Sequence, residues 1–282
     1  MQLQQRTIKR EVVFFGKGLQ TGRKVEMRCL PAPAGEGISF TRSDVGFSPE
    51  MKLNEGLFPE GSRRRTEISF SGVKLQTLEH FMSALWALGI DNLKIDVRGP
   101  ELPGLDGSAK DFLSALKESG VEEQAATRRY IEIGETIRIE DGERKITVLP
   151  NKSFSVEYTI DYPLDCIKKE TFRIELDEAS FEKEIAPART FCMKKEAVFL
   201  FLSGMGRGAT LENTLVLGNK GPVGTKLRFP NEPVRHKILD LVGDLYMLGM
   251  PVTGEFICEK SGHALNARVL KEIYSEYIRK EQ

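Results

Sequence analysis

Three polar residues recur at four-residue intervals in the segment NEPVRHKILDLVGDLYMLG, residues 231–249. They are His236, Asp240 and Asp244, and residues four apart lie one above the other on a helix face. The apolar residues of this segment recur at steps of three and four, which predicts a helix with one buried face. A column of one imidazole and two carboxylates beside such a face is costly to bury without a function. Taken alone, the spacing of His236 and Asp240 is also that of an ordinary surface pair.

The other two of the chain's three histidines also stand in patterned segments. His80 follows Glu79 in TLEHFMSALWALG, residues 77–89, which predicts a second helix capped by Thr77. His263 lies in the motif SGHALN. Two histidines and one carboxylate are enough for a catalytic zinc site that keeps a fourth position open. The sequence therefore leaves two interpretations open, a surface pair or a metal centre shared by two helices.

Composition limits the classes of function. Lysine plus arginine and aspartate plus glutamate both number 41, so the formal net charge is zero, which argues against general nucleic-acid binding. We find no apolar run of the roughly 20 residues that cross a bilayer and no secretory signal at the N-terminus. We therefore expect a cytoplasmic protein without an integral membrane segment. The four cysteines form no Cys-x-x-Cys pair, so any zinc site would depend on His and Asp.

The same order of elements appears twice along the chain. Each half has strands, then a helix ending in Leu-Gly, a strand, a Gly-Ser-Ala or Gly-His-Ala loop, and a second helix. This order predicts an α+β fold of two similar domains, residues 1–125 and 126–282, each an antiparallel-rich sheet with helices on one face. The polar and unpatterned segment 119–129 is the expected linker between them.

Both helices that carry metal-type residues have apolar patterns that indicate burial. If the helices of the two domains are sandwiched between the two sheets, Glu79 and His80 from the first domain meet His236 and Asp240 from the second. This arrangement would explain why such residues occur on helices that otherwise resemble core elements.

Several segments in this order are typical of one enzyme family and together span nearly the whole chain. They are GKGLQTG (16–22), TLEHFMSAL (77–85), ELPGLDGSA (101–109), ARTF (188–191), LENTLVLG (211–218), NEPVRHKILDLVGDLY (231–246) and SGHALN (261–266). The chain resembles the UDP-3-O-acyl-N-acetylglucosamine deacetylases, zinc amidases of lipid A (lipopolysaccharide) biosynthesis. The resemblance implies the same two-domain fold. It also implies the committed step of that pathway, removal of acetate from UDP-3-O-(hydroxyacyl)-N-acetylglucosamine.

The resemblance assigns roles position by position. The implied metal ligands are His80, His236 and Asp240. The implied metal is Zn²⁺, and the same donor types also suit Fe²⁺. The implied catalytic residues are Glu79 as general base, His263 as acid or electrostatic stabiliser, Asp244 as its orienting carboxylate, and Thr190 and Lys237 as polar groups lining the site. Whether Glu79 alone or Glu79 with His263 performs the proton transfers stays open.

The resemblance also implies contacts to the substrate, a small UDP-acyl-sugar, by a monomeric protein. The residues concerned are Leu19, Phe191, Leu200, Lys260, Tyr162 and Arg65. A β-α-β insert near residues 187–217 would form the passage for the acyl chain, with residues 198–202 as one wall; core packing is the alternative for these apolar residues. Two other functions are considered, namely another zinc amidohydrolase and a non-catalytic protein of the same fold.

Overall fold

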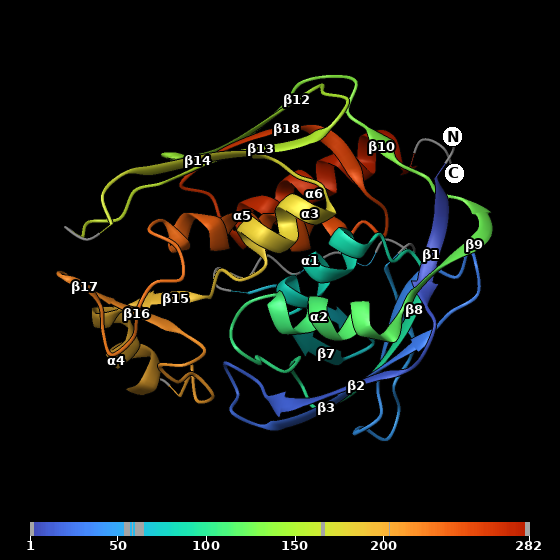
Figure 1. The fold of residues 1–282 in the computed structure, drawn as a ribbon, viewed down its shortest axis with the longest axis horizontal. Coiled ribbons are helices and arrows are strands. Elements are labelled where there is room, and N and C mark those ends of the chain that lie inside the picture. The colour runs from blue at the N-terminus through green and yellow to red at the C-terminus, as the bar shows by residue number, and fades with distance from the viewer. Residues whose placement is uncertain are drawn as a thin grey trace.

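The computed structural model describes residues 3–53, 57, 59, 65–164, 167–202 and 204–279. Two sheets form the outer layers of the molecule, and helices α1, α2, α5 and α6 lie between them (Figure 1). The prediction of an α+β fold with helices sandwiched between two sheets is confirmed.

The first sheet has five strands in the order β2-β3-β8-β4-β5. Its strands are β2 (Val12–Lys17), β3 (Lys24–Pro31), β4 (Ile38–Arg42), β5 (Met51–Lys52) and β8 (Leu93–Arg98). Only β4 and β8 pair in parallel within this sheet. Buried and more exposed residues alternate along β8, because successive side chains of a strand point to opposite faces. The buried face packs against helices α1 (Glu79–Leu88) and α2 (Lys110–Ser119).

The second sheet has the strand order β11-β12-β18-β13-β14, and β10 adds to β18 in parallel. Its strands are β10 (Ile131–Glu132), β11 (Ile137–Asp141), β12 (Arg144–Leu149), β13 (Phe154–Ile160), β14 (Glu170–Glu175) and β18 (Val252–Glu259). Helix α5 (Glu232–Tyr246) packs on β13 and β14, and α6 (His263–Tyr277) packs on β11 and β12. Helices α1 and α5 contact each other across the middle of the molecule.

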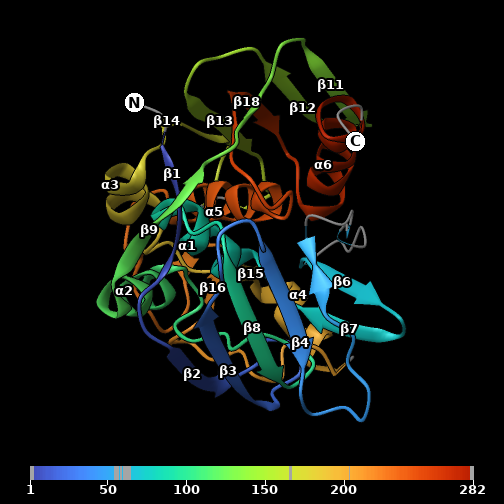
Figure 2. The ribbon, with the colours of Figure 1, turned by 90° about the vertical axis from the view of Figure 1, so that its right-hand side faces the viewer.

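The segment expected to be an unpatterned linker contains a strand. Strand β9 (Val121–Thr127) pairs antiparallel with β1 (Gln4–Ile8), and Figure 2 shows the pair along one flank, spanning the levels of the two sheets. The sequence did not reveal this strand because its hydrogen-bond partner lies at the other end of the first half. The proposed boundary after residue 125 falls within β9, and the division into residues 1–125 and 126–282 stays a proposal.

A β-α-β unit occupies the place where the insert was predicted. Strands β15 (Phe191–Met193) and β16 (Leu215–Gly218) are parallel, helix α4 (Lys194–Leu202) connects them, and β17 (Gly221–Pro222) pairs with β16. We call residues 190–227 the insert. A short helix α3 (Glu178–Ser180) and a π-helical turn (Phe181–Ile185) precede it.

The insert docks onto loops of the first half. The backbone amide of Gly208 donates to the Leu19 carbonyl at 3.1 Å, and the amide of Thr190 donates to the Gly107 carbonyl at 2.8 Å. At Gly107 (φ 79°) a Cβ atom would lie 1.7 Å from the carbonyl oxygen of Asn213. Glycine is therefore required where the insert approaches the loop of residues 101–109.

The predicted cap of helix α1 was wrong. The N-cap is Leu78, without a side-chain hydrogen bond, and the helix begins at Glu79. Thr77 adopts φ 58°, and its hydroxyl donates to Glu101 Oε1 at 2.9 Å. The buried Glu101 carboxylate also accepts from the amides of the 20–21 turn at 2.9 Å each. A local rule for helix starts could not anticipate this distant acceptor.

In the part of the chain that the structure describes, none of the helices has the length and apolar character that crossing a bilayer requires. A small hairpin, β6 (Glu67–Phe70) and β7 (Val73–Gln76), completes the described elements and leads directly into α1.

A buried candidate metal centre between two helices

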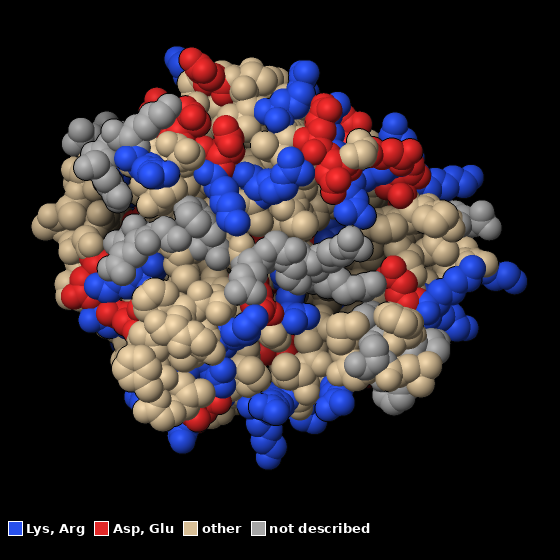
Figure 3. Space-filling view, turned by 180° about the vertical axis from the view of Figure 1, so that it is seen from behind, with Lys and Arg blue, Asp and Glu red and all other residues tan. Residues whose placement is uncertain are grey.

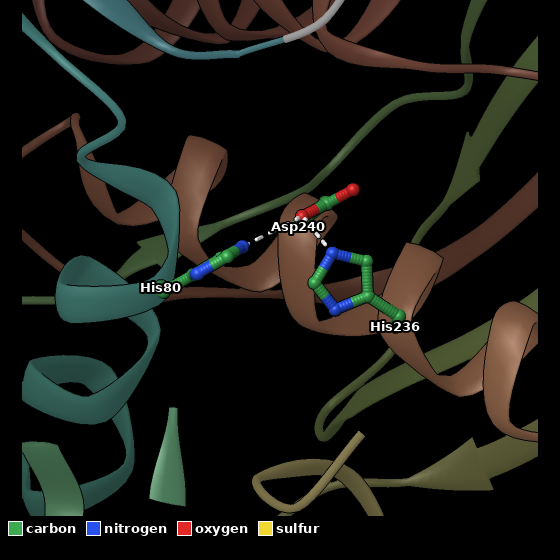
Figure 4. A group of neighbouring side chains, drawn as sticks. All are labelled: His80, His236 and Asp240. Carbon is green, nitrogen blue, oxygen red and sulfur yellow. Dashed lines mark ion pairs between the residues drawn. The ribbon is translucent and has the colours of Figure 1, made fainter. Parts of the chain in front are cut away.

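Helices α1 and α5 bring together the two histidines and the aspartate that the sequence singled out. Figure 4 shows His80 from α1 pointing towards His236 and Asp240 from α5. His236 Nε2 lies 3.2 Å and His80 Nε2 lies 3.9 Å from Asp240 Oδ1. One candidate ligand atom from each residue lies within 4.8 Å of the others. All three residues are buried, so the interpretation of His236 and Asp240 as a surface pair is wrong.

The close crossing of α1 and α5 depends on Gly243. A Cβ atom on Gly243 would lie 1.9 Å from the backbone carbonyl oxygen of Glu79. Real Cβ atoms essentially never come within 3.0 Å of such an atom, so any larger residue would push the two helices apart. The absence of a side chain at this position lets the helices bring His80 within reach of Asp240.

The surroundings of the two imidazoles leave each with a nitrogen able to bind a cation. His236 Nδ1 lies 3.1 Å from the carbonyl oxygen of Ala188. A carbonyl can only accept, so Nδ1 carries the proton and the lone pair is on Nε2, which faces Asp240. Burial lowers the pKa of His236, and burial together with the neighbouring imidazole lowers the pKa of His80 to about 3. Both rings are therefore neutral at physiological pH, which is the form that binds metals.

Asp240 supplies the observation that tests whether a cation fits this centre. Its Oδ1 atom is buried and has no hydrogen-bond partner among the described residues. A buried neutral polar group without a hydrogen-bond partner costs about 1 to 3 kcal/mol, and a buried charged acceptor without one costs more. The same oxygen is the one nearest to both imidazoles, so a divalent cation would satisfy it. Two imidazole nitrogens and one carboxylate oxygen form the donor set of catalytic zinc sites with an open fourth position.

A second group of side chains, Glu79 and His263, borders the same aspartate. Glu79 Oε1 lies 3.9 Å from His263 Nε2, which lies 3.6 Å from Asp240 Oδ2. The amide of Thr66 donates to Glu79 Oε2 at 3.1 Å. Burial raises the pKa of Glu79 to about 7. A carboxylate with a pKa near neutrality can both take up and release a proton under physiological conditions.

His263 is held in the protonated form by carboxylates. Its Nδ1 lies 2.8 Å from Asp244 Oδ2. Burial by itself would lower the pKa of His263, but the charges of Asp244, Asp240 and Glu79 together raise it to about 9. Asp244 is fixed in turn by Asn266 Nδ2 at 2.7 Å and by the hydroxyl of Thr66. The site thus contains a carboxylate able to act as a base beside an imidazolium able to act as an acid.

Lys237 and two aromatic residues form the rim next to the insert. Lys237 Nζ lies 2.6 Å from Asp240 Oδ2. Burial alone would lower the pKa of Lys237, but this contact raises it well above its usual value. The Phe191 ring lies edge-on to His236 and to Tyr162, with ring centroids 6.2 and 5.7 Å apart. The ammonium of Lys237 lies 5.7 Å from the Phe191 centroid.

The structure places the other predicted residues less directly. Thr190 is anchored by its backbone between Gly107 and Leu215, one residue before Phe191. Leu19 is buried against Gly104 in the turn that the insert contacts. The side chain of Leu200 lies outside the described residues.

The two predicted basic contacts are engaged by carboxylates. Lys260 Nζ lies 2.8 Å from Asp161 Oδ2 and 3.1 Å from Glu143 Oε2. The Arg65 guanidinium lies 3.3 Å from the Glu67 carboxylate. Arg65 directly precedes Thr66, whose amide donates to Glu79 and whose hydroxyl donates to Asp244.

A buried ion pair fixes both ends of the insert at the start of α5. Arg189 Nε lies 3.0 Å from Glu232 Oε1, and the amide of Arg228 donates to Glu232 Oε2 at 2.6 Å. Arg189 Nη2 also donates to the Lys226 carbonyl at 2.6 Å. Glu232 lies one turn before His236, and Arg189 follows the residue whose carbonyl orients that imidazole. The pair therefore sets the register between the insert and the candidate ligands.

Sequence reasoning missed the groups that hold this site in place. Asn266 lies three residues after His263 in the same motif, and a helical spacing argument could have found it. Thr66 lies in an irregular segment without any periodic pattern, and the Ala188 carbonyl is a backbone group. Only the folded chain could identify these last two.

The fold and this centre together define a class of protein. It is an α+β protein whose two helix-bearing halves meet at a buried centre lined by two imidazoles and a carboxylate, with an acid–base pair beside it. Metal-dependent hydrolases have this combination of features.

Comparison with known proteins identifies the family within that class. The model of the LpxC family, UDP-3-O-acyl N-acetylglycosamine deacetylase, matches residues 5–275. The chain belongs to this deacetylase family.

Curated relatives agree over nearly their full length, and each carries the name UDP-3-O-acyl-N-acetylglucosamine deacetylase. The relative from Acidithiobacillus ferrooxidans is 39% identical over 96% of this chain and 90% of its own length. The relative from Thermodesulfovibrio yellowstonii is 38% identical over 95% and 91%, respectively. The relative from Anaeromyxobacter sp. is 36% identical over 96% and 89%.

Proposed function

We propose that this protein is a zinc-dependent amidohydrolase that removes acetate from UDP-3-O-(hydroxyacyl)-N-acetylglucosamine in lipid A biosynthesis. Membership of the deacetylase family supports the reaction class, and the names of the relatives support the substrate. The observation that carries the proposal is the convergence of His80, His236 and Asp240, with the partnerless Asp240 oxygen between the two imidazoles.

His80, His236 and Asp240 would hold the metal, Zn²⁺ or the similarly bound Fe²⁺. When bound, such a cation supplies Lewis acidity that polarises an amide carbonyl and lowers the pKa of water towards about 7. The Ala188 carbonyl keeps His236 in the tautomer that presents Nε2 to the cation. Lys237 neutralises the second oxygen of Asp240 and thereby leaves the first for the metal.

Glu79 acts as the general base in this proposal. Amide hydrolysis needs a stronger nucleophile than water, and a neighbouring carboxylate provides it by removing a proton as water attacks the carbonyl carbon. Glu79 directly precedes His80 at the start of α1, so the backbone of the helix fixes its position relative to that ligand. The amide of Thr66 fixes Glu79 Oε2 and leaves Oε1 facing His263.

His263 stabilises the negative charge of the tetrahedral intermediate and donates a proton to the departing glucosamine nitrogen. Asp244 supports this role because it accepts from Nδ1 and leaves the Nε2 proton facing the site. A second route has Glu79 deliver the proton that it removed from water, with His263 acting through its charge alone. Thr190 and Lys237 are proposed as further polar groups around the reacting amide.

Substrate recognition is proposed at the junction of the insert and the second half. The Phe191 ring stands roughly perpendicular to the rings of both His236 and Tyr162, and Phe191 and Tyr162 would contact the sugar or acyl chain. Leu19 and Leu200 are proposed to line the acyl passage. Lys260 and Arg65 are proposed to bind the anionic part of the substrate, for which Lys260 would exchange its contacts with Asp161 and Glu143.

We further propose that the protein acts in the cytoplasm as a monomer. The single-chain origin of all the proposed ligands supports a monomer, since one copy supplies the complete donor set.

The test is acetate release from the UDP-acyl-sugar by protein of defined metal content. We expect His236→Ala to lose bound zinc and nearly all turnover. We expect Glu79→Gln to retain zinc by elemental analysis while turnover falls by about 10²- to 10⁴-fold. Glu118→Gln, at an exposed glutamate on α2, is the matched control and should keep full activity.

Three results would contradict the proposal. Full turnover of metal-depleted His236→Ala would remove the ligand role of that residue. Release of a different acyl group by the zinc-loaded protein would favour another amidohydrolase. Zinc binding without hydrolysis of any amide would favour a non-catalytic protein of this fold.

A further inference from the structure

The insert exposes more large apolar side chains than its length would suggest. Ten large apolar side chains are exposed in the described part of the chain, and four of them belong to the insert. They are Phe199, Leu202, Leu211 and Val223. The Phe199 and Leu202 residues, both on α4, are 65% and 79% exposed. Contiguous exposed apolar surface usually marks an interaction site.

The two most exposed residues lie on one face of α4. Lys195, Phe199 and Leu202 are separated by steps of four and three residues, which places them along a single face of the helix. Lys195 is exposed as well. This face of α4 therefore presents a basic residue followed by two bulky apolar groups, and α4 as a whole packs on β15 and β16.

Positive charge is concentrated in the same segment. The insert contains five basic and two acidic residues, a net charge of +3 in a chain whose total is zero. The basic residues, all exposed, are Lys194, Lys195, Arg207, Lys220 and Lys226. In Figure 3, which reverses the view of Figure 1, basic side chains project from the right-hand edge, where the insert lies.

Three of these lysines are at one end of α4. Met193, the residue before Lys194, pairs with Leu217 in the small sheet, and Lys220 lies in the turn between Gly218 and its partner Gly221. The turn with Lys220 is thus next to the beginning of α4. A basic group at one end of the helix and apolar groups about one and two turns further on match the two layers of a membrane surface, anionic headgroups above acyl chains.

We infer that the face of α4 with Lys195, Phe199 and Leu202 docks on the surface of a lipid bilayer that contains anionic lipids. Phe199 and Leu202 enter the boundary between headgroups and acyl chains, and the lysines at the start of α4 contact lipid phosphates. Charge complementarity selects this partner, because the insert is basic whereas the rest of the chain carries the compensating negative charge. The benefit for catalysis rests on the proposed function, since a substrate with a fatty acyl chain partitions into membranes.

Another exposed phenylalanine provides a matched control. Phe15 on β2 is 70% exposed, but the residue paired with it on β3 is Glu26. Phe15 belongs to the first sheet and not to the insert, so it lies outside the face of α4 that is inferred to dock. Substitution of Phe15 should therefore leave any membrane binding unchanged.

The experiment is co-sedimentation of the full-length protein with vesicles. One set contains phosphatidylcholine alone, and the other contains phosphatidylcholine mixed with phosphatidylglycerol. We expect binding to the anionic vesicles that weakens with added salt. The double substitution Phe199→Ser and Leu202→Ser should weaken that binding about tenfold or more, and Phe15→Ser should not.

Charge variants and mass measurements complete the test. Lys194→Gln with Lys220→Gln, which leaves the apolar groups in place, should reduce binding to anionic vesicles without altering the far-ultraviolet circular dichroism spectrum. Failure of the wild-type protein to sediment with anionic vesicles would overturn the inference, as would equal binding by the double serine variant. A dimer in solution that this variant dissociates would overturn it in favour of a second copy of the chain.

The outcome is independent of the proposed reaction. If the wild-type protein releases acetate from the substrate in solution but does not bind vesicles, the proposed function stands and the inferred membrane contact is refuted. Protein that binds vesicles but hydrolyses no UDP-acyl-sugar would do the reverse.

Discussion

Replacement of Gly243 by alanine is expected to destabilise the protein and weaken metal binding together. In an ordinary helix this substitution stabilises by about 1 kcal/mol, because alanine has the higher helix propensity. Here the new Cβ atom would lie 1.9 Å from the Glu79 carbonyl oxygen, whereas an ordinary contact is at least 3.4 Å. The backbones of α1 and α5 would have to separate by about 1.5 Å, and no side-chain rotation can relieve a clash with a carbonyl group.

The expected magnitudes follow from this displacement. Overpacking a core costs about 1 to 3 kcal/mol. Because the clash is with backbone, we expect the upper end of that range, or about 2 kcal/mol after subtracting the propensity gain. A change of this size lowers the melting temperature by roughly 4 to 8 °C in a protein of this length. Metal sites tolerate ligand displacements of only about 0.2 Å, so zinc affinity should fall by about 10- to 100-fold or more.

The assays are thermal unfolding of the metal-free protein and zinc titration against a competing chelator. Gly134→Ala is the matched control, because a Cβ atom there would meet nothing within 4 Å, and we expect its stability to change by less than about 0.5 kcal/mol. A Gly243→Ala protein that melts higher than wild type and binds zinc equally well would refute the packing argument. It would show that the helices can bring His80 to Asp240 without their close crossing.

Three further predictions concern the supports of the site. Arg189→Met leaves Glu232 buried without its cation, so the free energy of unfolding, measured by denaturant titration, should fall by about 3 to 5 kcal/mol. The control Arg173→Met removes one partner of an exposed ion pair and should change the free energy of unfolding by less than about 1 kcal/mol. Burial would raise the pKa of Asp106, but Ser108 and the Arg228 contact at 2.7 Å lower it overall. The stability that Asp106 contributes is thus present above its unfolded pKa of about 3.9 and is lost as the pH falls through the lower folded value. If Asp106→Asn lowered the free energy of unfolding by the same amount at pH 7 and at pH 2.5, this prediction would be contradicted. Removal of zinc with a chelator should lower the melting temperature and re-addition should restore it, since ligand at about 1,000 times Kd adds roughly 4 kcal/mol; identical melting curves with and without zinc would exclude a bound metal.

Fold class was predictable because apolar periodicity is a local property. The steps of three and four residues that predicted helices in segments 77–89 and 231–249 correspond to α1 and α5. Their order relative to the strands was enough to predict helical layers between two sheets. The strand β9 was missed for the opposite reason, because its polar sequence forms a strand only through hydrogen bonds to β1.

Candidate site residues were predictable where the helix itself places them on one face. His236 and Asp240 face the same side of α5 through their spacing alone, and the predicted sandwich of helices brought His80 to them. The resemblance to the deacetylases then gave His263 its role. The direct contacts of Thr66 and the Ala188 carbonyl with these groups were not predictable. One lies in a segment without periodicity, and the other is a main-chain atom that any residue would provide.

The amino-acid sequence by itself determined which residues could take part in chemistry, since residue type and helical spacing are written along the chain. The tertiary structure alone decided their chemical state. Burial between two helices raises the pKa of Glu79 to about 7, and three carboxylates raise that of His263 to about 9. Such shifts depend on distances and on exclusion of water, which arise only when segments far apart in the chain pack together.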